Sequence, residues 1–176
     1  ITVTTGGFFG QASFDLYDNP SDETGKWLEI SKEIDLAALN IGEPKGSMLS
    51  AFSVQNLPPE DFGASLGEQV LVIGYPKGFH DNIHNLPIVR NASIASAYKV
   101  PFLDWPLFLI DARLHPGTSG SPIITVPSII ARKDNGVAIT PQSTWYFLGV
   151  NSGEFGELQL NAVWYSSLIK KLLKIE

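Results

Sequence analysis

The sequence predicts an all-β protein, built as a barrel or a sandwich, and three observations support this fold class. Short runs rich in β-branched and aromatic residues recur along the chain, and turn-forming clusters of Gly, Pro, Asn and Asp separate them. Only one segment, at the C-terminal end, has apolar residues at helical spacing. The 176 residues are 44% hydrophobic and 17% charged, which is enough to bury a core in one domain or two small lobes.

Ten segments are expected to form strands. In chain order they are Ile1–Thr5, Phe14–Tyr17, Trp27–Ile30, Ile34–Leu39, Gln69–Tyr75, Leu86–Ala97, Leu107–Asp111, Ser121–Val126, Trp145–Asn151 and Leu158–Trp164. We expect a helix over Ser166–Ile175, because Leu and Ile recur there at helical spacing and a serine at its start can cap it. Residues 127–143 contain Pro, Asn-Gly and charges, and are expected to form a long surface loop.

The most informative motif is Gly117-Thr118-Ser119-Gly120-Ser121-Pro122, directly ahead of a β-branched run. Gly117 and Gly120 lack a Cβ and can take backbone dihedrals that other residues avoid. A tight turn here can point the N–H groups of Gly117 and Ser119 at one spot, where an oxyanion is stabilised. The motif fits either a Gly/Ser-rich turn between strands or a nucleophilic Ser119 beside an oxyanion hole.

This hexapeptide resembles the Gly-x-Ser-Gly-Gly/Ser-Pro signature around the nucleophile of chymotrypsin-like serine peptidases, and its Ser-Gly-Ser-Pro part is similar to bacterial glutamyl endopeptidases. The segment Phe108–Pro116 resembles the approach to that serine in Deg-type peptidases, with His115 in place of Asn. The resemblance implies a trypsin-like double β-barrel with a C-terminal helix, with residues 1–58 in the first barrel and 59–176 in the second. It also implies a serine endopeptidase, in which Ser119 is the nucleophile and the Gly117 and Ser119 N–H groups form the oxyanion hole.

A serine nucleophile needs a base, and the base needs an orienting carboxylate. The segment Ile34–Leu39 resembles the family's segment with the triad aspartate, so Asp35 is the candidate carboxylate; the alternative is an aspartate that caps a local turn. The family's histidine precedes the aspartate, but residues 1–34 contain no histidine. We therefore expect a sequence that is incomplete at its N-terminus, with the base upstream of residue 1 and the first barrel only partly present. Two alternatives stay open, a pseudoenzyme and an unusual placement of the base at His80, His84 or His115.

The same resemblance implies the substrate-binding residues. The segment Phe147–Gly153 resembles the strand that pairs with the substrate backbone, so Asn151, Ser152 and Gly153 are expected along the binding groove. Arg113 and His115 precede Ser119 by six and four residues, where the family walls its primary side-chain pocket. A cation there favours an acidic substrate side chain.

The composition of the chain indicates which classes of binding partner and cofactor to expect. The net charge of −6 and the pI near 5.0 argue against a nucleic-acid partner, which needs clustered Lys and Arg. No apolar run approaches the roughly 18 residues of a spanning helix, so no membrane partner is expected. The sequence has no Cys, which excludes disulfides and thiol chemistry and slightly favours a cytoplasmic location. A peptide or protein substrate is expected, with no cofactor and no metal.

Three other classes of function compete with this one. An α/β hydrolase needs Gly-x-Ser-x-Gly followed by a helix, whereas residue 121 is Ser and a strand is expected after it. A metal site at His80 and His84 needs a helix to bring residues four apart onto one face, and the surrounding Pro, Gly and Asn favour a loop. A catalytically inert trypsin-like scaffold that binds peptides stays open, because no histidine occupies the triad position.

Overall fold

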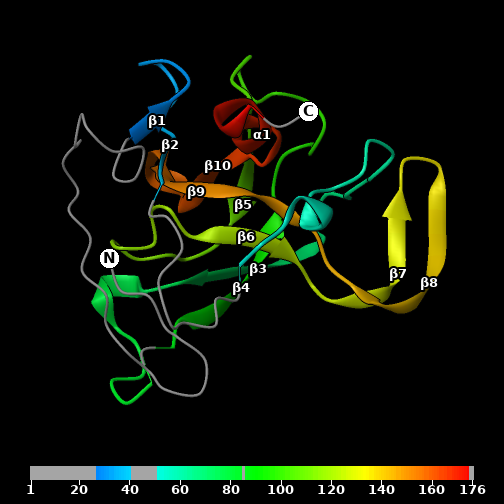
Figure 1. Cartoon of the computed structure of the whole chain (residues 1–176), viewed down its shortest axis with the longest axis horizontal. Coiled ribbons are helices and arrows are strands. Elements are labelled where there is room, and N and C mark those ends of the chain that lie inside the picture. The colour runs from blue at the N-terminus through cyan, green and yellow to red at the C-terminus, as the bar shows by residue number, and fades with distance from the viewer. Residues whose placement is uncertain (1–26, 41–50, 85, 175–176) are drawn as a thin grey trace. The chain divides into compact units, whose positions relative to one another are not determined.

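The computed structural model describes residues 27–40, 51–84 and 86–174, which are drawn in colour in Figure 1. The chain divides into two compact units. The larger one, here called the barrel unit, comprises Phe52–Phe79 and Pro87–Ser167. The smaller unit comprises Ile1–Ala51, His80–Leu86 and Leu168–Glu176. The strands expected over 1–5 and 14–17 lie outside the described residues, and the expected boundary between residues 58 and 59 stays a prediction.

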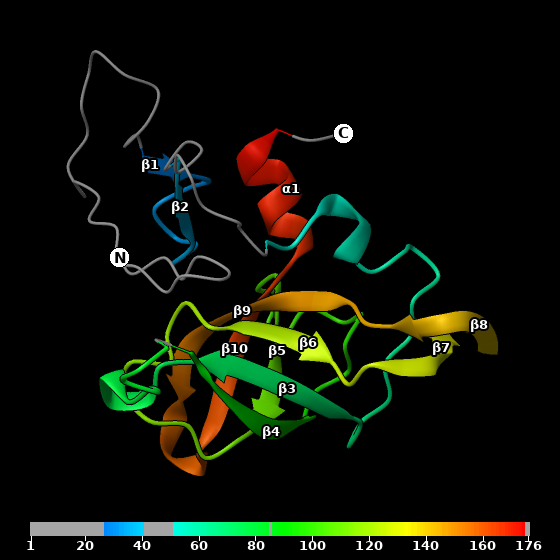
Figure 2. The ribbon, with the colours of Figure 1, turned by 60° about the horizontal axis from the view of Figure 1, so that its bottom comes forward.

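Six antiparallel strands close the barrel in the order β10-β5-β4-β3-β6-β9 (Figure 2). Closure leaves no strand edge unpaired within the barrel. Each of the six lies where the sequence predicts a strand, with ends that differ by up to four residues from the expected ones. Their bounds are β3 Gln69–Gly74, β4 Ile88–Ile94, β5 Leu107–Asp111, β6 Pro122–Thr125, β9 Phe147–Phe155 and β10 Leu160–Tyr165.

The barrel interior is filled by alternate side chains of its strands. In β3, Val70 and Val72 are almost fully buried while their neighbours are more exposed, as period-two alternation requires. Phe108 on β5 is fully buried, and its ring stacks on Tyr165 at a centroid distance of 5.4 Å. Tyr98 packs edge-on against both rings. Offset and edge-to-face pairs of this kind stabilise a core beyond their buried area.

The prediction of a surface loop over 127–143 is wrong, because these residues form a β-hairpin. Strand β7 (Ser128–Lys133) pairs with β8 (Gly136–Thr144), from Lys133 opposite Gly136 to Ile130 opposite Ile139, with a bulge nearer the barrel. The physical reason is local: β-branched residues stand on both sides of Asp134-Asn135, a two-residue turn followed by glycine.

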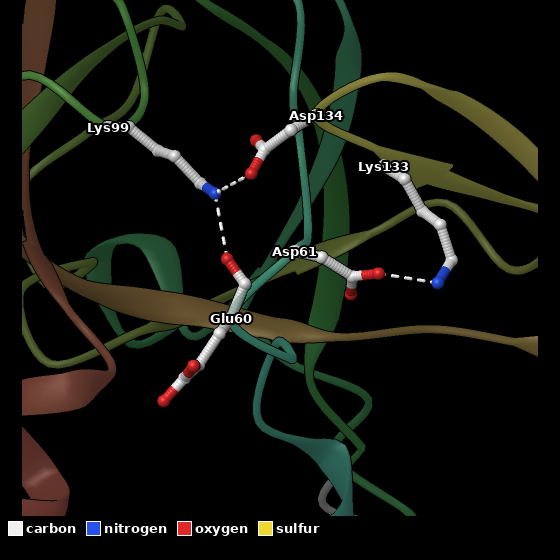
Figure 3. A network of polar contacts seen from close by, with 5 residues as sticks. All are labelled: Glu60, Asp61, Lys99, Lys133 and Asp134. Carbon is white, nitrogen blue, oxygen red and sulfur yellow. Dashed lines mark hydrogen bonds and ion pairs between the residues drawn. The ribbon is translucent and has the colours of Figure 1, made fainter.

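The hairpin tip is joined to the chain segment that precedes the barrel (Figure 3). Phe62, which is buried, forms a β-bridge with Lys133, and the Lys133 ammonium lies 2.5 Å from the Asp61 carboxylate. Lys99 donates to the Glu60 carbonyl at 2.8 Å and to the Asp134 carboxylate at 2.5 Å. These charges are close to half exposed, so we assign most of the attachment to the buried Phe62 and to backbone pairing.

The smaller unit contains a short antiparallel pair and a helix. Strand β1 (Trp27–Glu29) pairs with β2 (Ala37–Leu39), which is shorter than the expected Ile34–Leu39 because the Leu36 N–H turns back to the Ile34 carbonyl. Helix α1 (Ser167–Leu173) falls inside the predicted helix, with Leu168 and Leu172 buried.

The barrel unit also contains three short 3-10 turns, η1 Val54–Asn56, η2 Pro76–Gly78 and η3 Gly156–Leu158. No helix within the described ranges is long and apolar enough to cross a membrane.

Candidate active site

Ser119 lies in a tight turn between β5 and β6, and hydrogen bonds fix the turn on both sides of it. The Thr118 N–H and hydroxyl both donate to the His115 carbonyl, at 3.2 and 2.8 Å. The Ser121 N–H donates to the Thr118 carbonyl at 3.0 Å. Thr118 and Ser121 are buried, whereas Ser119 is exposed. The turn therefore holds its two neighbouring hydroxyl residues inside and presents Ser119 at the surface.

The glycines of the turn are required by backbone conformation and by close approach. Gly117 and Gly120 have φ of +91° and +83°, in the left-handed region that favours glycine. A Cβ on Gly117 would lie 3.1 Å from the Lys77 backbone nitrogen and from the Tyr75 carbonyl oxygen. The turn is pressed against η2 at this point, and the Lys77 N–H donates to the Pro116 carbonyl at 2.7 Å.

The N–H groups of Gly117 and Ser119 remain available to a ligand. Neither has a hydrogen-bond partner among the described residues, although the N–H groups of Thr118, Gly120 and Ser121 are all paired. Two unpaired backbone donors beside an exposed hydroxyl are what stabilisation of a tetrahedral oxyanion requires. The assignment of Gly117 and Ser119 as the oxyanion hole stays a prediction that this pattern supports.

Asn151 on β9 joins the substrate-binding segment to the nucleophile turn. Its N–H donates to the Ser121 carbonyl at 2.9 Å, and its carbonyl accepts from the Gly120 N–H at 2.7 Å. Its side-chain Nδ2 donates to the Thr118 carbonyl at 3.0 Å. The side chain is 1% exposed, and its Oδ1 has no partner among the described residues. Sequence reasoning placed Asn151 in the groove but missed this positioning contact.

The expected groove strand does run beside Ser119. A Cβ built on Gly153 would lie 3.8 Å from the Ser119 Oγ, so the backbone of β9 passes close to the hydroxyl. The sequence did not reveal a second close approach, between Gly74 at the end of β3 and Ser121. A Cβ on Gly74 would stand 2.1 Å from the Ser121 Oγ, so only glycine leaves room for this buried serine.

Arg113 and His115, the two predicted pocket residues, line a common pocket of about 210 Å³. The pocket lies where β5 and β9 end and β10 begins, and its other lining residues are Ala112, Leu114, Glu154, Gln159 and Asn161. Asn161 is 3% exposed and its Nδ2 donates to the Ala112 carbonyl at 2.6 Å. Glu154 and Asn161 were not predicted, because they come from strands distant in sequence from the Arg113 loop.

Asp35 belongs to the smaller unit, and Ser119 belongs to the barrel unit. Asp35 is exposed and precedes β2, so it does not lie inside a strand as expected. Its role as triad carboxylate stays a prediction. The histidines are spread over both units: His80 and His84 lie in the smaller unit, and His115 lies on the pocket wall. Within the described part of the barrel unit, the His115 side chain has no hydrogen bond to Ser119.

His84 is paired with a carboxylate of its own loop. Its Nδ1 lies 2.6 Å from Asp81 Oδ2, and the other Asp81 oxygen accepts from the Ile83 N–H at 2.9 Å. The Ile83 N–H, together with His84, lowers the pKa of Asp81. The described part of the chain brings together no group of three acidic or histidine side chains that could hold a metal ion.

A closed antiparallel barrel with an exposed serine in a glycine-flanked turn is consistent with the trypsin-like peptidase class. The chain belongs to that family: the family model for the trypsin-like peptidase domain matches residues 5–127, which is more than half of the chain. The predicted trypsin-like fold is thus confirmed.

No curated protein matches the chain. Among solved structures, the chain is similar to Rv3671c from M. tuberculosis H37Rv in an inactive mutant form, at 22% identity and a TM-score of 0.42. The match covers 66% of this chain and 52% of that one, so the chain spans about half the length of that structure.

Proposed function

We propose that the protein is a serine endopeptidase that uses Ser119 as its nucleophile. The observation that carries the proposal is the nucleophile turn, which holds an exposed serine hydroxyl beside the β9 backbone and two backbone N–H groups, those of Gly117 and Ser119, without a partner among the described residues. The Ser119 Oγ attacks the scissile carbonyl and passes its proton to a histidine base, and the carbonyl oxygen gains charge that the Gly117 and Ser119 N–H groups stabilise. The amine leaves with that proton, and water then hydrolyses the acyl-enzyme.

The catalytic base of this mechanism is proposed from the family resemblance. By resemblance, a histidine upstream of residue 1 takes the proton, and Asp35 orients it. The substrate backbone pairs with the 151–153 segment of β9, which supplies affinity through main-chain hydrogen bonds. The closeness of Gly153 to the Ser119 Oγ supports this path, because a peptide paired there passes directly over the hydroxyl.

A second function is a peptide-binding module without catalysis. It is favoured by one observation, that residues 1–34, which precede the candidate triad Asp35, contain no histidine. Such a scaffold would keep the groove beside β9 and bind peptides without cutting them.

A fluorophosphonate probe separates the two functions, because it forms a covalent adduct only with an activated serine. We expect the full-length protein to gain one adduct, mapped to Ser119, and to cleave peptides. Ser119→Ala should abolish both, whereas the matched variant Ser121→Ala, two residues away and buried, should keep the adduct. A protein that binds peptides but gains no adduct would support the binding module and overturn the endopeptidase.

A further inference from the structure

The pocket beside the nucleophile turn is positioned to receive one substrate side chain. It is lined from one side by the 112–115 segment and from the other by Glu154 on β9, the residue after Gly153. Because Gly153 lies next to the Ser119 Oγ, a peptide paired with β9 brings the residue before its scissile bond to this pocket. This step rests on the proposed function for the path of the peptide. The pocket has a volume of about 210 Å³ and is open to solvent, so it admits a side chain of a few heavy atoms.

The floor of the pocket is rigid and polar. Asn161 stands opposite Ile110 on β5 and opposite Glu154 on β9, so it belongs to both strand ladders at the pocket end. Its Nδ2 donates to the Ala112 carbonyl and, at 3.3 Å, to the Gln159 carbonyl. Burial and these two hydrogen bonds hold the Asn161 amide in place. Arg113, Glu154 and Gln159 line the same pocket.

The charges of the pocket are balanced, and the sequence alone did not show this. Arg113 supplies a cation, and Glu154 supplies a carboxylate. The structure records no ion pair for either among the described residues, so both are available to a ligand. An acidic substrate side chain would gain from Arg113 but meet the Glu154 charge, and a basic one would meet the reverse. An aliphatic side chain would make no hydrogen bond to Arg113 or Glu154, which would keep only solvent as their partner.

We infer that this pocket selects an uncharged carboxamide, with glutamine preferred as the residue before the scissile bond. A carboxamide oxygen accepts from Arg113, and its NH₂ group donates to the Glu154 carboxylate, so both pocket charges are satisfied at once. Glu154 is then the residue that decides between glutamine and glutamate. Loss of a hydrogen-bonding partner in a site built for it is strongly discriminating, whereas size alone is not.

The test uses peptides that differ only in that residue, as Gln, Glu, Lys or Leu. We expect kcat/KM for Gln to exceed that for Glu at least tenfold in the wild-type protein. Glu154→Gln should raise kcat/KM for Glu about tenfold, because it removes the repelling charge while keeping a polar side chain. Arg113→Gln should lower both Gln and Glu and raise Lys. Glu157→Gln, an exposed change in η3 outside the pocket, is the matched control and should leave all ratios unchanged.

Peptide binding tests the pocket without requiring turnover. In the Ser119→Ala protein, peptides that end in Gln, Glu, Lys or Leu should bind in the same order as they are cleaved, and Glu154→Gln should tighten the Glu peptide. A preference for Glu in the wild-type pocket, no preference in binding, or a Glu154→Gln protein with an unchanged Gln-to-Glu ratio would overturn the inference. Absence of a fluorophosphonate adduct on Ser119 would instead overturn the endopeptidase, while the binding order would still decide the pocket.

Discussion

The contact between Gly74 and Ser121 links the barrel core to the nucleophile turn, and it can be tested by adding one methyl group. In Gly74→Ala, the new Cβ would stand 2.1 Å from the Ser121 Oγ, whereas ordinary contacts begin at 3.4 Å. The overlap cannot be relieved by a long flexible side chain, since Ser121 is short and 5% exposed. Overpacking of this kind costs about 1–3 kcal/mol. For a chain of this size, a loss of about 2 kcal/mol lowers Tm by roughly 4–8 °C.

The double variant Gly74→Ala/Ser121→Ala shows whether the hydroxyl is the cause. Without the Oγ, the nearest atom is the Cβ of residue 121 at 3.2 Å, a tight contact that small shifts can relieve. We expect the double variant to recover at least about 1 kcal/mol relative to the sum of the single variants, a coupling of the size found for touching residues. Guanidinium unfolding followed by tryptophan fluorescence measures the three free energies, with Ser121→Ala as the control.

A second readout follows the turn itself. Because Ser121 is two residues from Ser119, displacement of Ser121 in Gly74→Ala should slow fluorophosphonate labelling, and the double variant should regain the rate. Strictly additive single-variant effects, or an unchanged stability of Gly74→Ala, would refute the reasoning that this glycine is set by clearance around Ser121.

Three further predictions address the core, the strand contact and pH. Phe108→Ala should reduce the free energy of unfolding by about 3–5 kcal/mol in chemical denaturation, because the ring is fully buried; a loss below about 1 kcal/mol would contradict its place in the core. Gly149→Ala should destabilise at least as much as Gly74→Ala in the same assay, since its Cβ would stand 2.1 Å from the Trp164 carbonyl oxygen, which is backbone; equal stability to wild type would rule this clash out. Burial raises the pKa of Tyr165 to about 12, above its ordinary value near 10. The folded state thus holds this proton more tightly, so its contribution is complete below about pH 10 and is lost as pH rises from about 10 to 12. Tyr165→Phe loses the hydrogen bond to the Tyr98 carbonyl and should be less stable than wild type at pH 8; the gap should narrow by pH 12, and a constant gap would count against the assignment.

The strands of the barrel could be predicted because each carries its signal within its own residues. The run Gln69–Gly74 alternates buried and exposed side chains, and turn residues end it. The hairpin over 128–144 carries a similar signal at Asp134-Asn135-Gly136, but the prolines and charges around it favour a loop. The prediction failed there because most side chains of this hairpin are exposed, so its strands do not need the alternation of apolar and polar residues by which a buried strand is predicted.

The parts of the site that sequence did not reveal depend on distant pairs. Glu154 joins Arg113 in one pocket only because β9 and β5 both pair with β10 and end at the same place. Gly74 is constrained by Ser121 through the pairing of β3 with β6. No local pattern distinguishes such residues from an ordinary exposed glutamate or a strand-end glycine.

The bond between Asn151 and Thr118 also sets an order of events during synthesis of the chain. The two residues are 33 positions apart, so the ribosome finishes Ser119 well before it makes the residue that ties the turn to β9. At about 5–20 residues per second, that interval is roughly 2–7 s. Strand β10, which closes the barrel, emerges later still. Until Asn151 is made, only bonds among earlier residues, such as those of Thr118 to His115 and of Ser121 to Thr118, hold the turn, and the barrel that carries it closes last.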